Sequence, residues 1–308
     1  MTRRYGDAVV ADGVSFSVQP GETFGLLGPN GAGKTTVIRM LTTLLPPTAG
    51  TARIEGHDIV SEKGAVRRAI GTVSQAQTTD ENLTARENLS VQGKMYGLWG
   101  RTLRTRIALR LRQVGLWERR GQVARQLSGG MRRRLEIARG VLHSPRVLFL
   151  DEPTSGLDPQ SRRAIWDMFD DLREHDPDLA IVLTTHAMEE ADFLCDRIAI
   201  MDRGRILCMD TPQALKVAQD TGERVEIETD RILDDATQEA IAASSGVSQI
   251  RYMSPARVHF SARPGDGTGR RMARDLEARG YHIVHLSVAL VTLEDVFFTY
   301  TGRALRDA

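Results

Sequence analysis

The sequence predicts an α/β fold for the first and larger part of the chain, followed by a small α+β domain. An apolar run at residues 24–27 leads through a glycine-rich loop into a helical run at residues 37–44, which gives the order strand, loop, helix. Residues 147–150 and 180–183 are apolar runs of the length expected for strands buried on both faces. These strands predict a parallel sheet at the centre of the first domain.

Length and composition limit the kinds of protein this can be. A chain of 308 residues suits one large domain and a smaller one, at about 100–200 residues per domain. The 41 basic and 40 acidic residues nearly cancel, so no net charge favours a nucleic-acid partner. Cys195 and Cys208 fit no metal spacing and indicate a reducing compartment. No secretory leader follows Met1, and no apolar run approaches the roughly 20 residues of a membrane span, so we expect a cytoplasmic protein.

The loop between the first strand and its helix has the spacing of a phosphate-binding loop. Gly28 begins the pattern Gly-x-x-x-x-Gly-Lys-Thr, which ends at Gly33, Lys34 and Thr35. Its glycines let backbone N–H groups point at one oxyanion, and the helix start adds a partial positive charge. Lys34 can reach the β- and γ-phosphates of a nucleoside triphosphate, and the Thr35 hydroxyl can ligate Mg²⁺. A glycine-rich turn without a ligand is the alternative, which we disfavour because loop, lysine, hydroxyl and flanking elements agree.

Short strands are predicted on both sides of this loop. Apolar and polar residues alternate over residues 1–23 as they do in paired strands. One strand is predicted at residues 8–10 and a second at residues 14–18. Tyr5 is either an aromatic that stacks on a purine or a surface residue. Residues 70–75 form a strand that ends in Gln75, whose side chain can reach a metal or an attacking water near the triphosphate.

A helical region follows at residues 82–116, and its arginine-rich outer face is more typical of a packed helical subdomain than of a nucleic-acid patch, because no aromatics interleave with the arginines. Ser128, Gly129 and Gly130 then precede a helix at residues 132–142. A helix start with this composition exposes N–H groups and a hydroxyl, so it predicts a second oxyanion site. The same tripeptide also serves as an ordinary helix N-cap.

Two adjacent carboxylates, Asp151 and Glu152, follow the buried strand at residues 147–150. Consecutive strand residues point in opposite directions, so we expect the two carboxylates to differ in role. Asp151 suits the coordination sphere of Mg²⁺, and Glu152 suits polarising the water that attacks the γ-phosphate. Asp158 follows in a tight turn before a helix, and His186 ends the strand at residues 180–185, where it can hydrogen-bond the γ-phosphate or its water.

The pattern changes after about residue 224. Strands at residues 224–229, 248–252, 256–261 and 282–286 and helices at residues 233–243 and 270–279 give the order strand–helix–strand–strand–helix–strand, which suggests a ferredoxin-like α+β unit. A last helix at residues 293–300 has an apolar face, which packs either on its own domain or on a partner. No catalytic cluster is evident after residue 215, so a regulatory or assembly role for this domain is a hypothesis.

Taken in order, these motifs resemble the ATP-binding subunit of an ABC transporter over about residues 1–215. The resemblance implies a P-loop NTPase fold of the ABC nucleotide-binding type, with a mixed sheet core and a helical subdomain at about residues 80–145. The domain bounds that we expect are 1–220 for this ATP-binding domain and 221–308 for the accessory domain.

The resemblance also implies roles for individual residues. Glu152, His186 and Gln75 would be catalytic, and Thr35, Gln75 and Asp151 would hold Mg²⁺. The residues that would bind ATP are Tyr5, which resembles the adenine-stacking aromatic, the Walker A residues Gly28, Pro29, Asn30, Gly31, Ala32, Gly33, Lys34, Thr35 and Thr36, the signature residues Ser128, Gly129 and Gly130, and Asp158 of the D-loop.

Two features refine the resemblance. Met131 stands where many family members have glutamine, which argues against a polar contact from this position to the nucleotide. The run Met-Arg-Arg-Arg-Leu at residues 131–135, the tail at residues 292–297 and Thr301-Gly302 resemble the daunorubicin-resistance branch of exporters.

With one Walker A loop and one signature per chain, the resemblance implies a homodimer in which ATP lies between the loop of one copy and the signature of the other. It further implies two separately encoded membrane-spanning permease subunits, contacted through residues 80–95, a location on the cytoplasmic side of the membrane, and no nucleic-acid partner. Export of a hydrophobic drug, antibiotic or lipid is the function that we expect. An uptake transporter is one alternative, and an ATPase acting on ribosomes or damaged DNA is another, although the two cassettes or long coiled-coil insertion typical of the latter are missing here.

Overall fold

The computed structural model describes residues 1–218, 223–263 and 265–301. The chain divides into two compact units, with the division between Thr211 and Pro212. The domain boundary that we expected at residues 220–221 lies outside the described residues, as does Gly302 of the tail motif.

A six-stranded sheet forms the centre of the first unit, in the order β10-β9-β3-β8-β7-β6. All neighbouring strands are parallel except β9 and β10, which form an antiparallel hairpin. The sheet is therefore mixed, and its parallel centre confirms the expectation from the apolar runs. The strands are β3 (Thr23–Leu27), β6 (Ile70–Val73), β7 (Val147–Asp151), β8 (Ala180–Thr185), β9 (Arg197–Asp202) and β10 (Arg205–Asp210).

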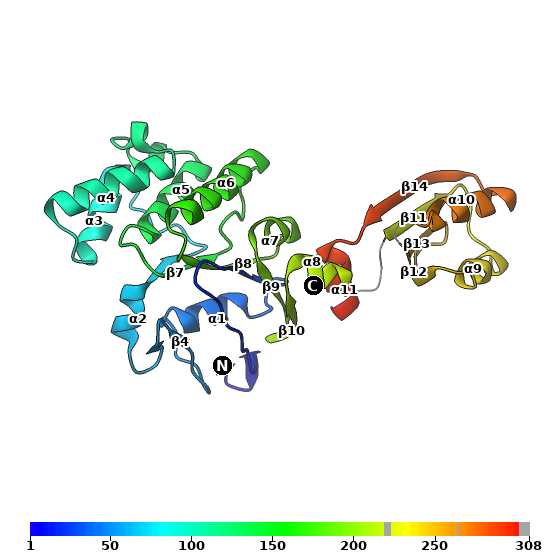
Figure 1. Ribbon diagram of the computed structural model, residues 1–308, viewed down its shortest axis with the longest axis horizontal. Coiled ribbons are helices and arrows are strands. Elements are labelled where there is room, and N and C mark those ends of the chain that lie inside the picture. Colours follow the sequence, from blue (N-terminus) through cyan, green and yellow to red (C-terminus); the bar gives the residue numbers. More distant parts are fainter. Residues whose placement is uncertain (219–222, 264, 302–308) are drawn as a thin grey trace. The chain divides into compact units, whose positions relative to one another are not determined.

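Helices cover both faces of this sheet. Figure 1 shows α1 (Lys34–Leu41) on one side, with α5 (Gly129–Gly140) and α6 (Pro159–His175) on the other. Central strand residues such as Phe24, Leu26 and Leu148 are wholly buried between these layers, which is why β3, β7 and β8 are apolar without alternation. Because the central strands are parallel, their carboxyl ends and the loops that follow them lie at the same edge of the sheet.

The N-terminal segment differs from the sequence-based prediction. β1 (Arg3–Tyr5) and β2 (Ala8–Ala11) pair antiparallel, but residues 12–22 contain no strand, so the strand predicted at residues 14–18 is wrong. The apolar side chains of this segment pack on the main sheet instead of pairing along a ladder, and the Phe16 ring stacks on Phe24 with 4.7 Å between centroids. A second short hairpin, β4 (Arg53–Ile54) and β5 (His57–Asp58), precedes α2 (Lys63–Ala69).

The predicted helical region consists of α3 (Ala85–Met95) and α4 (Gly100–Gln113), which pack against each other and against α5. Two short 3₁₀ turns, Trp117–Arg119 and Ala124–Gln126, lead from α4 to α5. Thr84 begins α3 with a capping box, in which the threonine and glutamate side chains each bind the other's backbone N–H. After α6 and β8, α7 (Met188–Leu194) completes the helices of this unit.

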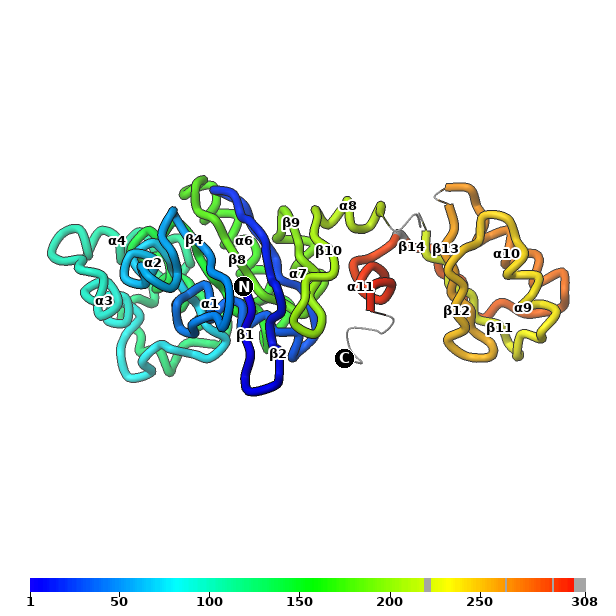
Figure 2. The backbone as a smooth tube through the Cα atoms, turned by 90° about the horizontal axis from the view of Figure 1, so that it is seen from below, coloured from blue at the N-terminus to red at the C-terminus, as the bar shows by residue number. Residues whose placement is uncertain are grey.

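The second unit begins with α8 (Pro212–Val217) and contains a four-stranded sheet in the order β12-β13-β11-β14, with all neighbours antiparallel. Figure 2 shows α9 (Asp235–Ala242) and α10 (Thr268–Ala278) on one face of this sheet, where Val225, Phe260 and Leu276 form the core. The last helix, α11 (Leu293–Thr301), packs on α8 within the same unit. The strands are β11 (Glu223–Thr229), β12 (Val247–Ser254), β13 (Arg257–Ala262) and β14 (Ile283–Leu290). No helix of the described residues is long and apolar enough to cross a membrane.

Candidate functional site

The predicted phosphate-binding loop connects the end of β3 to the start of α1. Gly31 and Gly33 have φ angles of 83° and 98°, in the left-handed region that favours glycine. A Cβ on Gly28 would lie 2.2 Å from the Met201 carbonyl oxygen, so only glycine fits there. Gly33 is also the N-cap of α1 and offers no side chain to cap it. The first N–H groups of α1 are therefore left open for an anion.

Lys34 lies over this loop and is only 5% exposed. Its ammonium donates to the carbonyl oxygens of Gly28 at 2.6 Å and Pro29 at 2.9 Å. Burial lowers the pKa of Lys34, and the nearby Glu152 and Asp151 carboxylates act in the opposite direction by favouring the charged form. The ammonium can exchange these carbonyls for phosphate oxygens with little movement of its buried stem.

The hydroxyl of Thr35 meets Asp151 across the sheet edge. Asp151 Oδ1 accepts hydrogen bonds from Thr35 Oγ1 at 3.0 Å and from Thr184 Oγ1 at 2.6 Å. A hydroxyl and a carboxylate oxygen in contact are typical protein ligands of Mg²⁺, which takes its other ligands from phosphates and water. The Thr35 hydroxyl and the Asp151 carboxylate are therefore a pair of ligands that suits Mg²⁺. The sequence analysis missed Thr184, although a polar residue near the end of a buried apolar strand was the available signal.

Glu152 lies between two of the predicted catalytic side chains. Its Oε2 accepts from Gln75 Nε2 at 3.2 Å, and its Oε1 is 3.1 Å from His186 Nδ1. The Glu152 side chain is 9% exposed, whereas that of His186 is 45% exposed. The structure thus brings together three side chains that are up to 111 positions apart (186 − 75) in the sequence.

The backbone conformation of Glu152 explains why its carboxylate meets different partners from the carboxylate of Asp151. β7 ends at Asp151, and Glu152 has a φ of 48°, a strained value for a residue with a side chain. Its N–H donates to the Thr184 carbonyl oxygen at 3.1 Å. The two carboxylates therefore face different partners because of this turn, and not because of the strand alternation on which the prediction was based.

A second buried carboxylate fixes the turn after Glu152. Glu190, on α7, is 1% exposed and accepts a hydrogen bond from Thr154 Oγ1 at 2.6 Å. This hydrogen bond holds the segment before Asp158 against α7. Asp158 itself is exposed and caps α6 through a bond from the Ser161 N–H at 2.9 Å. Hydrogen bonds from Ser161 lower the pKa of Asp158.

The second predicted anion site is the start of α5. Ser128 is the N-cap, and its hydroxyl accepts from the Met131 N–H at 3.3 Å. Ser128 is exposed, while Gly130 is buried where a Cβ would lie 2.7 Å from Ser161 Oγ, so glycine lets α5 approach α6 closely. Within the described residues, the structure gives the Ser128 hydroxyl no bond to the phosphate-binding loop.

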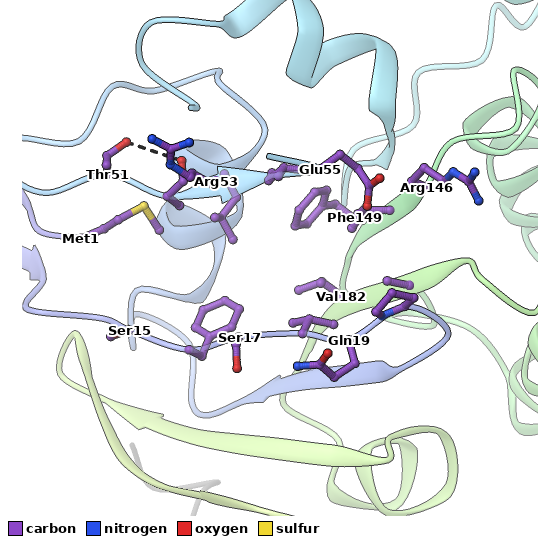
Figure 3. Close-up of a pocket in the computed structure, with 18 of the residues that line it drawn as sticks. Met1, Ser15, Ser17, Gln19, Thr51, Arg53, Glu55, Arg146, Phe149 and Val182 are labelled. Atoms are coloured by element: carbon purple, nitrogen blue, oxygen red, sulfur yellow. Dashed lines mark hydrogen bonds between the residues drawn. The ribbon is translucent and has the colours of Figure 1, made fainter. Parts of the chain in front are cut away.

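Two further features complete the description of the first unit. Tyr5 is 49% exposed on β1, with the Arg3 guanidinium 4.6 Å from its ring centroid. A pocket of about 350 Å³ lies over the amino-terminal parts of β7 and β8. Figure 3 shows Phe149 and Val182 in this pocket, with Arg146 near its edge. None of the predicted site residues lines it, so it is separate from the phosphate-binding loop.

Comparison with known proteins agrees with this geometry. The ABC transporter family matches residues 11–155 of the chain. The daunorubicin/doxorubicin resistance ATP-binding protein DrrA of Streptomyces peucetius is 39% identical over 310 residues, which cover 100% of this chain and 92% of DrrA. The linearmycin resistance ATP-binding protein LnrL of Bacillus subtilis is 36% identical over 308 residues, covering 99% and 97% of the two chains.

Solved structures share the fold of the first unit. A dimeric post-hydrolysis state of the ATP-binding cassette MJ0796, bound to ADP and Pi, superposes with a TM-score of 0.60 at 27% sequence identity. The match covers 68% of this chain and 94% of that one. A chain of this fold therefore holds hydrolysed nucleotide in a dimer.

Proposed function

This chain belongs to the ATP-binding subunits of ABC transporters, and we propose that it drives export of a hydrophobic drug, antibiotic or lipid through separate membrane subunits. Membership confirms the ABC ATPase fold and the ATP hydrolysis that the sequence analysis expected. The resemblance to the daunorubicin-resistance branch is confirmed as well, over the full length of the chain. Relatives named for resistance to daunorubicin and linearmycin support export of such compounds rather than uptake.

One observation carries the catalytic part of the proposal. Gln75 and His186 converge on the Glu152 carboxylate, while Thr35 meets Asp151 beside it. These groups lie at the carboxyl edge of the parallel strands, next to the loop that holds Lys34. A base, two groups that can orient a water, and a metal-binding pair are the parts that hydrolysis of a γ-phosphate requires.

The proposed mechanism assigns each part a task. The backbone N–H groups from Gly28 to Thr36 cradle the phosphates, and Lys34 binds the β- and γ-phosphate oxygens. Thr35 and Asp151, with Gln75, would hold Mg²⁺, which neutralises charge on the phosphates. Glu152 accepts the proton of the attacking water, and His186 and Gln75 hold that water and the γ-phosphate in place. The adenine stacks on Tyr5.

The same proposal uses a second copy of the chain to complete each site. Ser128, Gly129 and Gly130 of one copy bind the γ-phosphate held by the loop of the other, and Asp158 lies at the contact between copies. The exposed N-terminus of α5 supports this arrangement, as does the dimer reported for a chain of similar fold. ATP then closes the dimer, and hydrolysis lets it reopen.

We propose that the helical subdomain contacts the two membrane subunits, which hold the protein at the cytoplasmic face of the membrane. Exposed apolar side chains gather near the end of α3, where Val91 is 49%, Met95 78% and Trp99 63% exposed. Such a group suits an apolar partner better than water. The region lies within or next to residues 80–95, which the sequence analysis proposed for this contact.

For the rest of the chain we propose an accessory domain of ferredoxin-like fold at residues 221–308, after an ATP-binding domain at residues 1–220. The strand order β12-β13-β11-β14 with two helices on one face supports this fold. The division of the chain between Thr211 and Pro212 supports a boundary near the proposed one.

Replacing the proposed base tests the function. In Glu152→Gln, we expect ATP hydrolysis to fall by at least about 100-fold, as loss of a general base costs. ATP affinity should remain, and ATP should trap a closed dimer, because the amide keeps the size of the carboxylate but accepts no proton. Hydrolysis rates and the molar mass in solution with ATP measure both effects.

The matched control is Glu189→Gln, on the exposed side of α7. It should leave hydrolysis and dimer lifetime unchanged. A Glu152→Gln protein that hydrolyses ATP at the wild-type rate contradicts the role proposed for Glu152.

A further inference from the structure

Three consecutive arginines follow the signature of α5, and the middle one differs from its neighbours. Arg133 is 8% exposed, and its carboxylate partner Glu136 is 3% exposed. Arg132 is partly exposed, with 26% of its side chain accessible, and its guanidinium lies 3.5 Å from the Glu81 carboxylate. The proposed function gives these arginines no task, so the burial of Arg133 needs another explanation.

All five N–H donors of the Arg133 guanidinium are used. Nε donates to the Pro153 carbonyl oxygen at 2.7 Å, and one terminal nitrogen donates to the carbonyl oxygens of Asp151 at 3.0 Å and Glu152 at 3.1 Å. The other terminal nitrogen donates to the Ser74 carbonyl oxygen at 2.6 Å and to Glu136 at 3.1 Å. A planar guanidinium with five donors can join these points, whereas a lysine ammonium, with three donors, cannot.

These bonds hold the backbone that carries the proposed base. The acceptors are the three consecutive carbonyl groups of residues 151–153, which flank and include the left-handed Glu152. A strained backbone conformation persists only where its surroundings hold it. Burial lowers the pKa of Arg133, and Glu136 offsets this effect. Arg133 therefore supplies three of the hydrogen bonds that fix the orientation of this turn.

The same helix also holds the loop that carries Gln75. Arg133 binds Ser74 on one side of that glutamine, and Glu136 accepts from the Thr78 N–H on the other. One helical turn later, Arg139 donates to Thr78 Oγ1 at 3.1 Å. Both ends of the Gln75 segment are thus bound to α5, the helix that begins at Ser128.

We propose that Arg133 is a positioning residue that locks the Glu152 turn and the Gln75 loop to α5. The inference rests on the proposed function, in which the start of α5 binds the triphosphate held by the other copy. Movement of α5 upon that contact moves Glu152 and Gln75 with it.

The test compares Arg133→Gln with the matched control Arg132→Gln in the full-length chain, by measuring kcat, KM, ATP affinity and the thermal midpoint. We expect kcat of Arg133→Gln to fall by at least about tenfold, because a small displacement of a catalytic group has such an effect. Its ATP affinity should stay within about threefold of the wild type, because no phosphate contact is lost. Arg133→Lys should recover only part of kcat, and Arg132→Gln should behave as the wild type.

A second comparison asks whether Arg133 acts through Glu152. In a Glu152→Gln background, adding Arg133→Gln should lower the residual single-turnover rate by clearly less than the roughly tenfold expected in the wild type, because one of the two groups that Arg133 positions is already absent. If the two changes instead lower the single-turnover rate by the product of their separate effects, the inference is wrong. A normal kcat in folded Arg133→Gln, or equal losses of kcat and ATP affinity, would overturn it too.

A third variant covers the case in which Arg133→Gln does not fold. Glu136→Gln keeps the acceptor for Thr78 but removes the charge that pairs with Arg133. We expect a lower kcat with unchanged ATP affinity, and an unchanged kcat overturns the inference. A wild-type rate in Glu152→Gln alone would instead contradict the proposed function. Failure of the inference on Arg133 and failure of the proposed function can therefore be told apart.

Discussion

The two helix starts that the sequence marks as anion sites differ in how complete they are. At the start of α1, Lys34 is 5% exposed and Thr35 is bonded to Asp151, so the ammonium group and the side chains proposed to hold Mg²⁺ are already in contact with their neighbours. At the start of α5, Ser128 is exposed, and in the described part of the chain its hydroxyl is bonded only to the N–H of Met131. The first helix start therefore has further groups around it that can bind a ligand, whereas the second has only its own N–H groups and the Ser128 hydroxyl.

The second helix start therefore needs further partners to bind an anion. A helix N-terminus offers N–H groups and a partial positive charge, which bind a phosphate weakly without further contacts. A triphosphate held by the loop of another copy supplies the missing charge. The comparison therefore supports a composite site, built from one helix start of each copy.

The largest effect is expected at the complete site. Lys34→Ala should weaken ATP binding by about 1000-fold, since loss of a buried, hydrogen-bonded charge partner costs about 4 kcal/mol. Equilibrium binding of ATP to the isolated chain measures this effect. Arg39→Ala, on the exposed side of the same helix, is the control and should bind ATP normally. ATP affinity that survives in Lys34→Ala would show that the phosphates bind elsewhere.

A smaller effect is expected at the incomplete site. Aspartate caps a helix as well as serine does, so Ser128→Asp should keep the thermal midpoint of the protein. Its carboxylate would face a triphosphate in the closed dimer, and such repulsion should lower the hydrolysis rate by about 100-fold. ATP affinity of the monomer should not change, because the complete site is untouched. A normal hydrolysis rate contradicts the composite site.

Mixing the last two variants sharpens the comparison. In a heterodimer of Lys34→Ala and Ser128→Asp chains, one composite site carries both changes and the other carries neither. An equal mixture should therefore recover about a quarter of the wild-type rate, because about half of the dimers contain one intact site. A mixture no more active than its two components would mean that each chain hydrolyses ATP alone.

The smallest effect is expected from Thr184, whose hydroxyl supports the proposed Mg²⁺ ligand Asp151. Thr184→Val keeps the shape of a wholly buried side chain but removes the bond to Asp151 and the acceptor of the bond that the Glu152 N–H donates to the Thr184 hydroxyl at 3.0 Å. The Mg²⁺ concentration for half-maximal hydrolysis should rise by about tenfold, as is typical when a ligand loses its supporting bond. Thr185→Val is the control, since the Thr185 hydroxyl is bonded to the Ala187 N–H instead. An unchanged Mg²⁺ requirement would exclude this support of Asp151.

Contiguous motifs could be predicted because their chemistry depends on local backbone geometry. The loop from Gly28 to Thr36 specifies its own turn, and Asp151 and Glu152 follow directly from a buried strand. The strand predicted at residues 14–18 was wrong because alternation indicates only that one face is buried. Whether such a segment also pairs with a neighbour depends on the rest of the fold.

The local sequence specifies the separate elements of this protein: a phosphate-binding loop, two helix starts with the composition of anion sites, and carboxylates at the ends of buried strands. How these elements come into contact depends on the folded chain as a whole. Three sets of contacts join segments far apart in the chain: Thr184 with Asp151, Gln75 and His186 with Glu152, and Arg133 with the carbonyl groups of Ser74 and of residues 151–153. Their approach depends on sheet order and helix packing, which no local pattern of residues encodes.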